Sequence, residues 1–265
     1  MPELPDVETF KRYVDATALH QPIETVEVDA ERELKGMAPV TLARRLSGQS
    51  LERTRRHGKY LFVHVSGDGW LRLHFGMTGR LRYFRDDDKR PDHTRLLLRF
   101  DNGYQLAYDC RRRLGTIGLV DDPDAFIADN ELGPDALDPA LDESGFCKLM
   151  ADRRGTVKPA VMDQAFIAGL GNVYVDEILF RARLHPRAEP RKLDAKTCGR
   201  LYRAMHDILD EAIARQADPD RLPGSWLLHH KRPGETCPRC GEPLDKITVS
   251  GRSTWFCPGC QKEGA

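Results

Sequence analysis

Four cysteines near the C-terminus form the strongest chemical signal in the sequence. They occur as two pairs, Cys237-Pro-Arg-Cys240 and Cys257-Pro-Gly-Cys260, with sixteen residues between the pairs. Four thiolates at this spacing can surround Zn²⁺ tetrahedrally, and they leave no coordination position open for water. The pattern therefore predicts one structural zinc ion in a small C-terminal unit, whose folding the metal largely drives.

The N-terminus offers a nucleophile. Pro2 and Glu3 follow the initiator, so removal of Met1 would expose a secondary amine beside a carboxylate. An α-amino group titrates near roughly pH 8, and its neutral form can condense with an aldehydic carbon to give an iminium. The alternative is a terminus without chemistry ahead of a helix that Asp6 caps.

Two segments further along the chain carry residue types suited to nucleic acid. Lys59 ends the basic run 53–59, and a lysine in such a turn can hold a phosphate or deliver a proton. Met77 lies in the sequence Gly-Met-Thr-Gly, where a buried methionine would be unusual. An apolar side chain at a loop tip can fill the gap that an extruded base leaves.

A hairpin is predicted between the two cysteine pairs, with strands over 246–249 and 253–256. Its turn places Arg252 at the tip of a metal-fixed loop. A guanidinium there is either an ordinary solvated charge or a bidentate phosphate ligand.

The remaining pattern indicates an α+β multidomain protein. Val7–Ala18 predicts a leading helix, and short apolar runs separated by glycine-containing turns predict an antiparallel β-sandwich. The acidic stretch 121–142 has no sustained period and is interpreted as an interdomain connection. The apolar runs that predict strands are 60–65, 70–75, 81–84 and 96–100. In the second half of the chain, apolar residues at steps of three and four positions predict helices over 146–151, 158–166, 172–182 and 195–215. We expect three domains, at 1–130, 131–225 and 226–265.

The formal net charge is zero over 265 residues, which alone would argue against a polyanionic partner. The charge is segregated, however: residues 120–145 hold nine acidic and no basic side chains, whereas residues 44–59 hold six basic side chains and one acidic one. No apolar stretch is long enough for a membrane span and the start is not a secretory signal, so we expect a cytoplasmic protein. In that compartment Cys110, Cys147 and Cys198 are expected to be ordinary thiols.

Taken in order, these motifs resemble those of the formamidopyrimidine-DNA glycosylase family, which also includes endonuclease VIII. The resemblance runs from residue 2 to residue 261, and the Pro-Glu-Leu-Pro start is more similar to the formamidopyrimidine branch. The matching segments are Pro2–Glu8, His57–Leu61, His74–Gly79, Arg112–Gly115, Glu131–Pro134, Gly169–Phe180 and the cysteine-bounded ribbon.

The resemblance implies a bifunctional glycosylase and abasic-site lyase that removes oxidised purines from duplex DNA. Pro2 would attack C1′ of the damaged nucleotide, and Glu3 would act as acid and base. Lys59 would protonate during β-elimination, and Arg252 would assist δ-elimination and bind phosphate.

The resemblance also assigns DNA contacts. Lys158 and Asn172, the latter opening a helix of a helix-two-turn-helix element, would hold phosphates that flank the extruded nucleotide, and Arg153 and His74 match further contacts. The three residues that would enter the duplex are Met77, Arg112 and Leu114, with Arg112 facing the orphaned base. The implied partner is damaged double-stranded DNA, bound by a monomer in the bacterial nucleoid, with no membrane contact.

Two departures from the family pattern bear on the substrate. Leu114 stands where the family commonly has phenylalanine, which removes an aromatic stacking face. The connection 216–236 is short and lacks the usual glycine- and phenylalanine-rich segment that caps the extruded base. Three alternatives stay open: a preference for oxidised pyrimidines, a catalytically silent binder of damaged DNA, and a zinc-ribbon adaptor that binds protein.

Overall fold

The computed structural model describes residues 1–67 and 69–262, and the chain divides into two compact units. Unit 1 runs from Met1 to Glu131, and unit 2 begins at Leu132. The predicted α+β class is confirmed, whereas the division of unit 2 into a helical domain and a ribbon domain stays a prediction. Within the described residues, no helix is long and apolar enough to cross a membrane.

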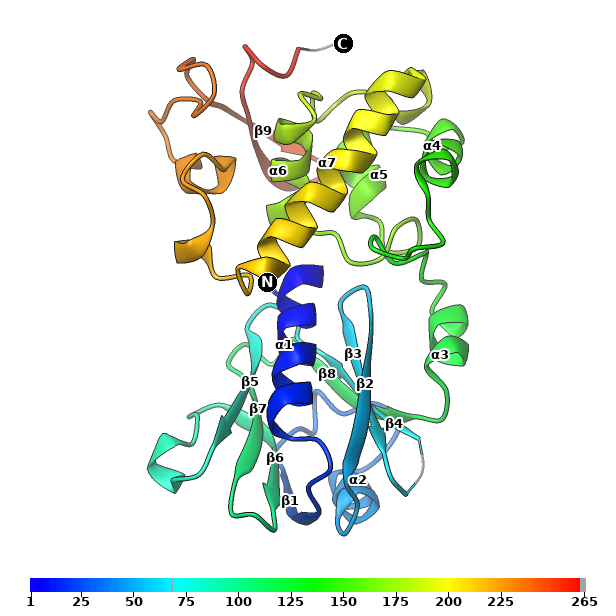
Figure 1. Ribbon diagram of the computed structural model, residues 1–265, viewed down its shortest axis with the longest axis vertical. Helices are drawn as coiled ribbons and strands as arrows, with labels where there is room; N and C mark the ends of the chain where they lie inside the picture. Colours follow the sequence, from blue (N-terminus) through cyan, green and yellow to red (C-terminus); the bar gives the residue numbers. More distant parts are fainter. Residues whose placement is uncertain (68, 263–265) are drawn as a thin grey trace. The chain divides into compact units, whose positions relative to one another are not determined.

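Unit 1 is a β-sandwich of two four-stranded antiparallel sheets, as Figure 1 shows. One sheet has the order β1-β6-β7-β5 and the other the order β2-β3-β4-β8. The strands are β1 (Ile23–Val28), β2 (Leu51–His57), β3 (Tyr60–Val65), β4 (Trp70–His74), β5 (Gly79–Phe84), β6 (Thr94–Phe100), β7 (Gln105–Cys110) and β8 (Thr116–Val120). Their inward residues, such as Leu61, Leu73 and Leu98, form one buried core.

Four short elements complete unit 1: α1 (Leu4–Thr17), α2 (Pro39–Leu46), the 3₁₀ turn η1 (Asp87–Lys89) and α3 (Pro123–Asp129). Helix α1 buries Leu4, Val7 and Val14 and packs against β2, β3 and β5. Its N-cap is Glu3, whereas the alternative interpretation of the N-terminus had placed the cap at Asp6. Asp6 is instead the third helical residue, and the two residues form a capping box.

Helix α3 lies in the acidic stretch that was predicted to be irregular, so that prediction is wrong there. Asp122 accepts a hydrogen bond from the Asp124 N–H, and Pro123 begins the helix. The Phe126 ring then packs edge-on against Tyr60 and Phe62, with centroids 5.2 and 5.7 Å apart. Capping and this aromatic contact together stabilise a helix that has no apolar period.

Unit 2 is mainly helical and ends in a two-stranded hairpin. Its elements are α4 (Glu143–Ala151), α5 (Val157–Met162), α6 (Asn172–Arg181), η2 (Pro190–Lys192), α7 (Ala195–Ala214), η3 (Pro219–Arg221), η4 (Leu227–His230), β9 (Asp245–Val249) and β10 (Arg252–Phe256). The apolar face of α7, including Leu201, Ile208 and Leu209, packs on α4 and α6. Helix α6 is buried from Tyr174 to Phe180 and forms the centre of the unit.

The expectation of ordinary thiols holds for Cys110, which is buried and free, but is wrong for the other pair. Cys147 on α4 and Cys198 on α7 form a disulfide, with their Cα atoms 5.8 Å apart. Packing of α4 against α7 brings the two residues within the span that a disulfide needs.

Candidate active site

The predicted nucleophile lies at the start of a well-anchored helix. Glu3 is 1 % exposed, and its backbone N–H donates to Asp6 Oδ2 at 2.9 Å. Pro2, one residue earlier, is only half-buried. Burial raises the pKa of Asp6 to about 6, and the hydrogen bond from the Glu3 N–H partly offsets this effect. The capping box therefore fixes the backbone that carries Pro2 and places two carboxyl groups beside it.

Lys59 and His74 lie in one neighbourhood of unit 1. Lys59 lies in the tight turn directly before β3 and is 9 % exposed, while His74 ends β4 directly opposite Tyr60. Burial lowers the pKa of His74 to about 4, and the positive charges of Lys59 and Arg72 add to the effect. At neutral pH the imidazole is uncharged. Its Nδ1 accepts from the Gly76 N–H at 3.3 Å, so its proton is on Nε2, which can donate to a phosphate.

The three residues predicted to enter the duplex, Met77, Arg112 and Leu114, here called the wedge, lie on two adjacent loops. Met77 and Leu114 are 40 % and 52 % exposed, although both side chains are large and apolar, and Arg112 is exposed as well. The Arg112 N–H donates to Thr78 Oγ1 at 3.0 Å. At Gly76, a Cβ atom would lie 2.4 Å from the Leu114 backbone, so only glycine permits this approach of the two loops.

An ion-pair cluster that the sequence did not single out supports the wedge. Arg113 adopts a left-handed backbone conformation with φ 53°. Its guanidinium lies 3.0 Å from Asp29 and 3.8 Å from the fully buried Glu33. The cluster holds the backbone between Arg112 and Leu114 in a conformation that a non-glycine residue rarely adopts.

In unit 2, Lys158 is buried at 1 % exposure and has a dense set of partners. Its Nζ donates to Asp176 Oδ1 at 2.6 Å, to Thr254 Oγ1 at 2.7 Å and to the Ser253 carbonyl at 3.4 Å. Asp176 also accepts from Lys231 Nζ at 2.9 Å. These contacts tie α5 and α6 to strand β10. Asp176 lies in the segment Gly169–Phe180 that resembles the family, but nothing in the sequence indicated that it pairs with Lys158.

Asn172 and Arg252 flank that network. Asn172 is the first residue of α6, as predicted, and its Nδ2 donates to the Ser253 carbonyl at 3.4 Å. Its Oδ1 is buried and has no hydrogen-bond partner among the described residues. Arg252 opens β10 after a turn in which Ser250 and Gly251 both have positive φ. It is exposed and makes no ion pair within the described part of the chain.

Arg153 lies beside a polar cavity of about 580 Å³ in the same unit, which Arg154, Thr156 and Ser250 also line. Its guanidinium pairs with Asp163 and stacks over the Phe166 ring at 4.6 Å. These two contacts hold the arginine at the cavity wall, and Asp163 already neutralises part of its charge.

The four predicted zinc ligands converge. Their Sγ atoms lie within 4.8 Å of one another, with 3.9 Å between Cys237 and Cys260 and 3.5 Å between Cys240 and Cys257. Tetrahedral Zn²⁺ with Zn–S bonds of about 2.3 Å requires sulfur atoms about 3.8 Å apart, so the donor set fits zinc. The Cys260 N–H donates to Cys257 Sγ, which further favours a thiolate there.

The short connection 216–236 packs against the helices of unit 2, of which it is a part. Trp226 is 1 % exposed, and its Nε1 donates to Glu211 Oε2 at 3.3 Å. Glu177, on α6, accepts from the Leu228 N–H at 3.2 Å. Burial raises the pKa of Glu177 to about 7, against the opposing effect of hydrogen bonds from the Leu227 and Leu228 N–H groups. Buried anchors therefore fix this segment.

Three family models match the chain. The formamidopyrimidine-DNA glycosylase N-terminal domain matches residues 1–117, and the H2TH domain of the same enzymes matches residues 132–221. A zinc finger found in FPG and IleRS matches residues 234–262.

Individual proteins are similar over nearly the whole chain. A formamidopyrimidine-DNA glycosylase of Pelotomaculum thermopropionicum is 35 % identical, with 99 % of each chain covered. The solved structure of Lactococcus lactis Fpg (MutM) with DNA containing N7-benzyl-Fapy-dG is 31 % identical, with a TM-score of 0.89, and the match covers 99 % of this chain and 100 % of that one. A MutM complex with DNA containing carbocyclic 8-oxo-G is 32 % identical at a TM-score of 0.88, with the same coverage. The chain belongs to the formamidopyrimidine-DNA glycosylase family.

Proposed function

We propose that this protein excises oxidised purines from damaged duplex DNA and then cleaves the strand at the abasic site. The proposal rests mainly on the geometry of the N-terminus. There the capping box of Glu3 and Asp6 fixes the backbone next to Pro2, beside two carboxyl groups. The solved relatives are bound to DNA with oxidised or ring-opened guanine analogues, which supports this substrate class.

The proposed reaction begins after Met1 has been removed. The neutral Pro2 nitrogen attacks C1′ of the damaged nucleotide, and the bond from C1′ to the base breaks. Glu3 acts as acid and base in this step. The result is an iminium between Pro2 and the opened sugar. Loss of a proton from C2′ then expels the 3′ phosphate by β-elimination, with Lys59 supplying a proton. A second elimination, assisted by Arg252, releases the 5′ phosphate.

DNA binding is assigned to side chains or helix ends that can donate hydrogen bonds to phosphate. Arg252 presents an exposed guanidinium, Asn172 lies at the N-terminus of α6, and neutral His74 offers Nε2–H. The ammonium of Lys158 is engaged by Asp176, Thr254 and Ser253, which favours a positioning role for it under strand β10. Direct phosphate binding by Lys158 and Arg153 stays a prediction.

The exposed loops of unit 1 are assigned to the duplex interior. Met77 on the first loop and Leu114 on the second present apolar area that folding leaves in water, and Arg112 lies two positions before Leu114 on the second loop. Insertion would bury that area in the gap left by the extruded base, while Arg112 would face the orphaned base.

The four cysteines are assigned one structural zinc ion per chain, which would hold the hairpin that carries Arg252. We further propose that the protein acts as a monomer, and that its place in the cell is the bacterial nucleoid, where its substrate lies.

Borohydride trapping tests the mechanism. Borohydride reduces the iminium to a stable amine, so incubation with abasic-site DNA should produce one covalent adduct that maps to Pro2. Pro2→Gly should greatly reduce the adduct. The matched control is protein that retains Met1, with an otherwise unchanged sequence. Equal trapping and cleavage by that form would show that the Pro2 amine is not the nucleophile. Full DNA affinity without any adduct would favour the silent binder.

A further inference from the structure

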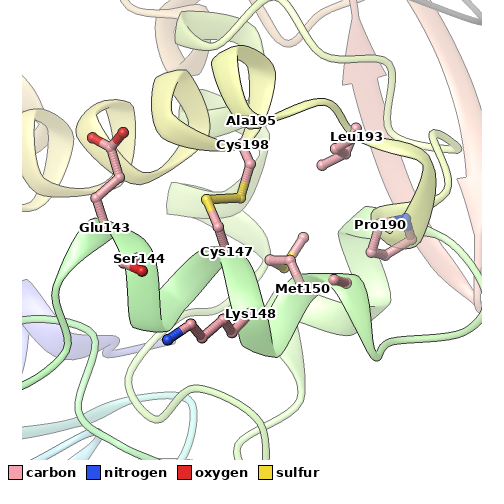
Figure 2. A pocket seen from close by; sticks show the side chains of 10 residues that line it. Glu143, Ser144, Cys147, Lys148, Met150, Pro190, Leu193, Ala195 and Cys198 are labelled. Atoms are coloured by element: carbon pink, nitrogen blue, oxygen red, sulfur yellow. A yellow bond between two sulfur atoms is a disulfide. The ribbon is translucent and has the colours of Figure 1, made fainter.

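The disulfide between Cys147 and Cys198 lines a cavity in unit 2 of about 580 Å³. Figure 2 shows the sulfur–sulfur bond spanning α4 and α7, with Pro190 and Leu193 on one side and Glu143 on the other. Most of the lining is apolar, and the cavity contains none of the residues assigned to DNA or zinc. It is therefore a separate feature of the fold.

The two sulfur-bearing residues differ in their exposure. Cys198 is 3 % exposed, whereas Cys147 is partly exposed. Thiol–disulfide exchange needs a thiolate to reach one sulfur atom along the bond, with the other sulfur leaving. Both residues line the cavity, but Cys147 is the more exposed of the two, which favours attack of a thiol on Cys147 Sγ with Cys198 as the leaving sulfur.

We propose that this disulfide is an exchange site for low-molecular-weight thiols, which enter through the cavity and form a mixed disulfide with Cys147. A thiolate attacks Cys147 Sγ, the sulfur–sulfur bond breaks, and its electron pair remains on Cys198, which takes a proton from water. A second thiolate attacks the added sulfur and frees Cys147. The protein disulfide thus gains two electrons, and two thiols are oxidised to their own disulfide.

The leaving group is well placed. Cys198 lies in the first turn of α7, which begins at Ala195 after the N-cap Asp194. Backbone N–H groups at a helix N-terminus favour a thiolate, which makes Cys198 the better leaving sulfur.

The helix pair does not depend on the disulfide alone. Phe146 is fully buried against Tyr202, and the Tyr202 hydroxyl donates to the Leu141 carbonyl at 2.9 Å. Glu143 and Arg203 add an ion pair at 2.6 Å. These contacts should keep α4 in place after reduction. The exchange therefore changes a covalent link near the segment that leads to Arg153, while unit 2 stays folded.

The test uses the full-length, zinc-loaded protein under native conditions, with glutathione and 2-mercaptoethanol as probes. After quenching by alkylation, peptide mapping should find the probe on Cys147 and the alkyl group on Cys198, with zinc retained. The proposal is wrong if the probe is found mainly on Cys198. It is also wrong if neither cysteine reacts below the urea concentration that unfolds unit 2.

Two sets of variants separate entry through the cavity from simple surface reactivity. Leu193→Trp fills the cavity and should slow the exchange about tenfold, whereas Arg191→Trp, a neighbour outside the lining, should leave it unchanged. In Cys198→Ser the remaining Cys147 thiol should react with oxidised glutathione about ten times faster than the Cys198 thiol of Cys147→Ser, because Cys147 is the more exposed of the two and access outweighs the thiolate character of Cys198. Equal rates for the two tryptophan variants would overturn the cavity as the entry route, and equal rates for the two serine variants would overturn Cys147 as the attacked residue.

Discussion

Replacing Glu177 by glutamine should stabilise the protein at alkaline pH, even though Glu177 accepts a buried hydrogen bond. The side chain is 1 % exposed, and burial raises its pKa from 4.5 to about 7. Between these values the folded protein holds a proton that the unfolded chain has lost. The contribution of Glu177 to the free energy of unfolding therefore falls as the pH rises from about 4.5 to about 7 and is constant above that range.

The size of the pKa shift of Glu177 determines how much the free energy of unfolding changes with pH. A difference of 2.5 pKa units corresponds to about 3 kcal/mol of lost stability once the carboxylate is ionised. Glutamine keeps an oxygen that can accept from the Leu228 N–H, but it carries no charge at any pH. Relative to wild type, Glu177→Gln should gain about 3 kcal/mol at pH 8 and about 1 kcal/mol at pH 5.

Urea unfolding of the zinc-loaded protein at both pH values measures this difference. The matched control is Glu211→Gln, because Glu211 accepts from Trp226 in the same segment but is 29 % exposed and lies near Arg181 and Arg215. Loss of its charge removes favourable pairs and should lower stability slightly at both pH values. If Glu177→Gln is destabilised equally at pH 5 and pH 8, the ionised carboxylate stabilises the segment and the reasoning from burial is refuted.

The remaining predictions concern the zinc ion, the phosphate contacts and the lesion. Cys257→Ser should lose the metal and weaken DNA binding, which elemental analysis and a binding titration would show; full affinity without zinc would contradict the role of the ribbon. Arg252→Ala should reduce the slope of log affinity against log salt by about 0.9, whereas Lys196→Ala, an exposed charge on α7, should not. Single-turnover excision should be slower for 8-oxoguanine opposite cytosine than for formamidopyrimidine or hydantoin lesions, because ring-opened bases are poorly stacked and need less discrimination once extruded. Equal or faster release of 8-oxoguanine would show that a capping function persists.

Elements with a clear period could be predicted from the sequence. The run Tyr60–Val65 was predicted as a strand and forms β3, and the helix predicted over 195–215 is α7 at 195–214. In both cases the apolar positions decide which face is buried, so local pattern and tertiary packing agree. The cysteine pairs were equally informative, because four sulfur atoms at fixed spacing can meet in only a few ways.

Contacts between distant segments could not be predicted in this way. Lys158 meets Thr254 across 96 positions, and Cys147 meets Cys198 across 51. Nothing local in either segment specifies its partner, because the pairing depends on how whole helices pack. Helix α3 is a different case, because Asp122-Pro123 is a recognisable helix start that the surrounding acidic charge obscured.

Several residues of this chain conflict with the rules for a stable fold, and some of them are assigned to function. Met77 and Leu114 expose apolar area, Arg113 adopts a left-handed backbone conformation, and Lys158 and Glu177 place ionisable groups in the interior. A conflict of this kind lowers stability unless neighbouring contacts offset it, and two of these residues have such a neighbour, Glu33 for Arg113 and Asp176 for Lys158. Removing the supporting partner should therefore impair the loop or strand that presents the functional group, even though no DNA contact is assigned to the partner. The Glu177→Gln experiment tests the opposite change, because it removes a conflict with a stable fold instead of a supporting partner. Neutralising this buried charge should stabilise the fold.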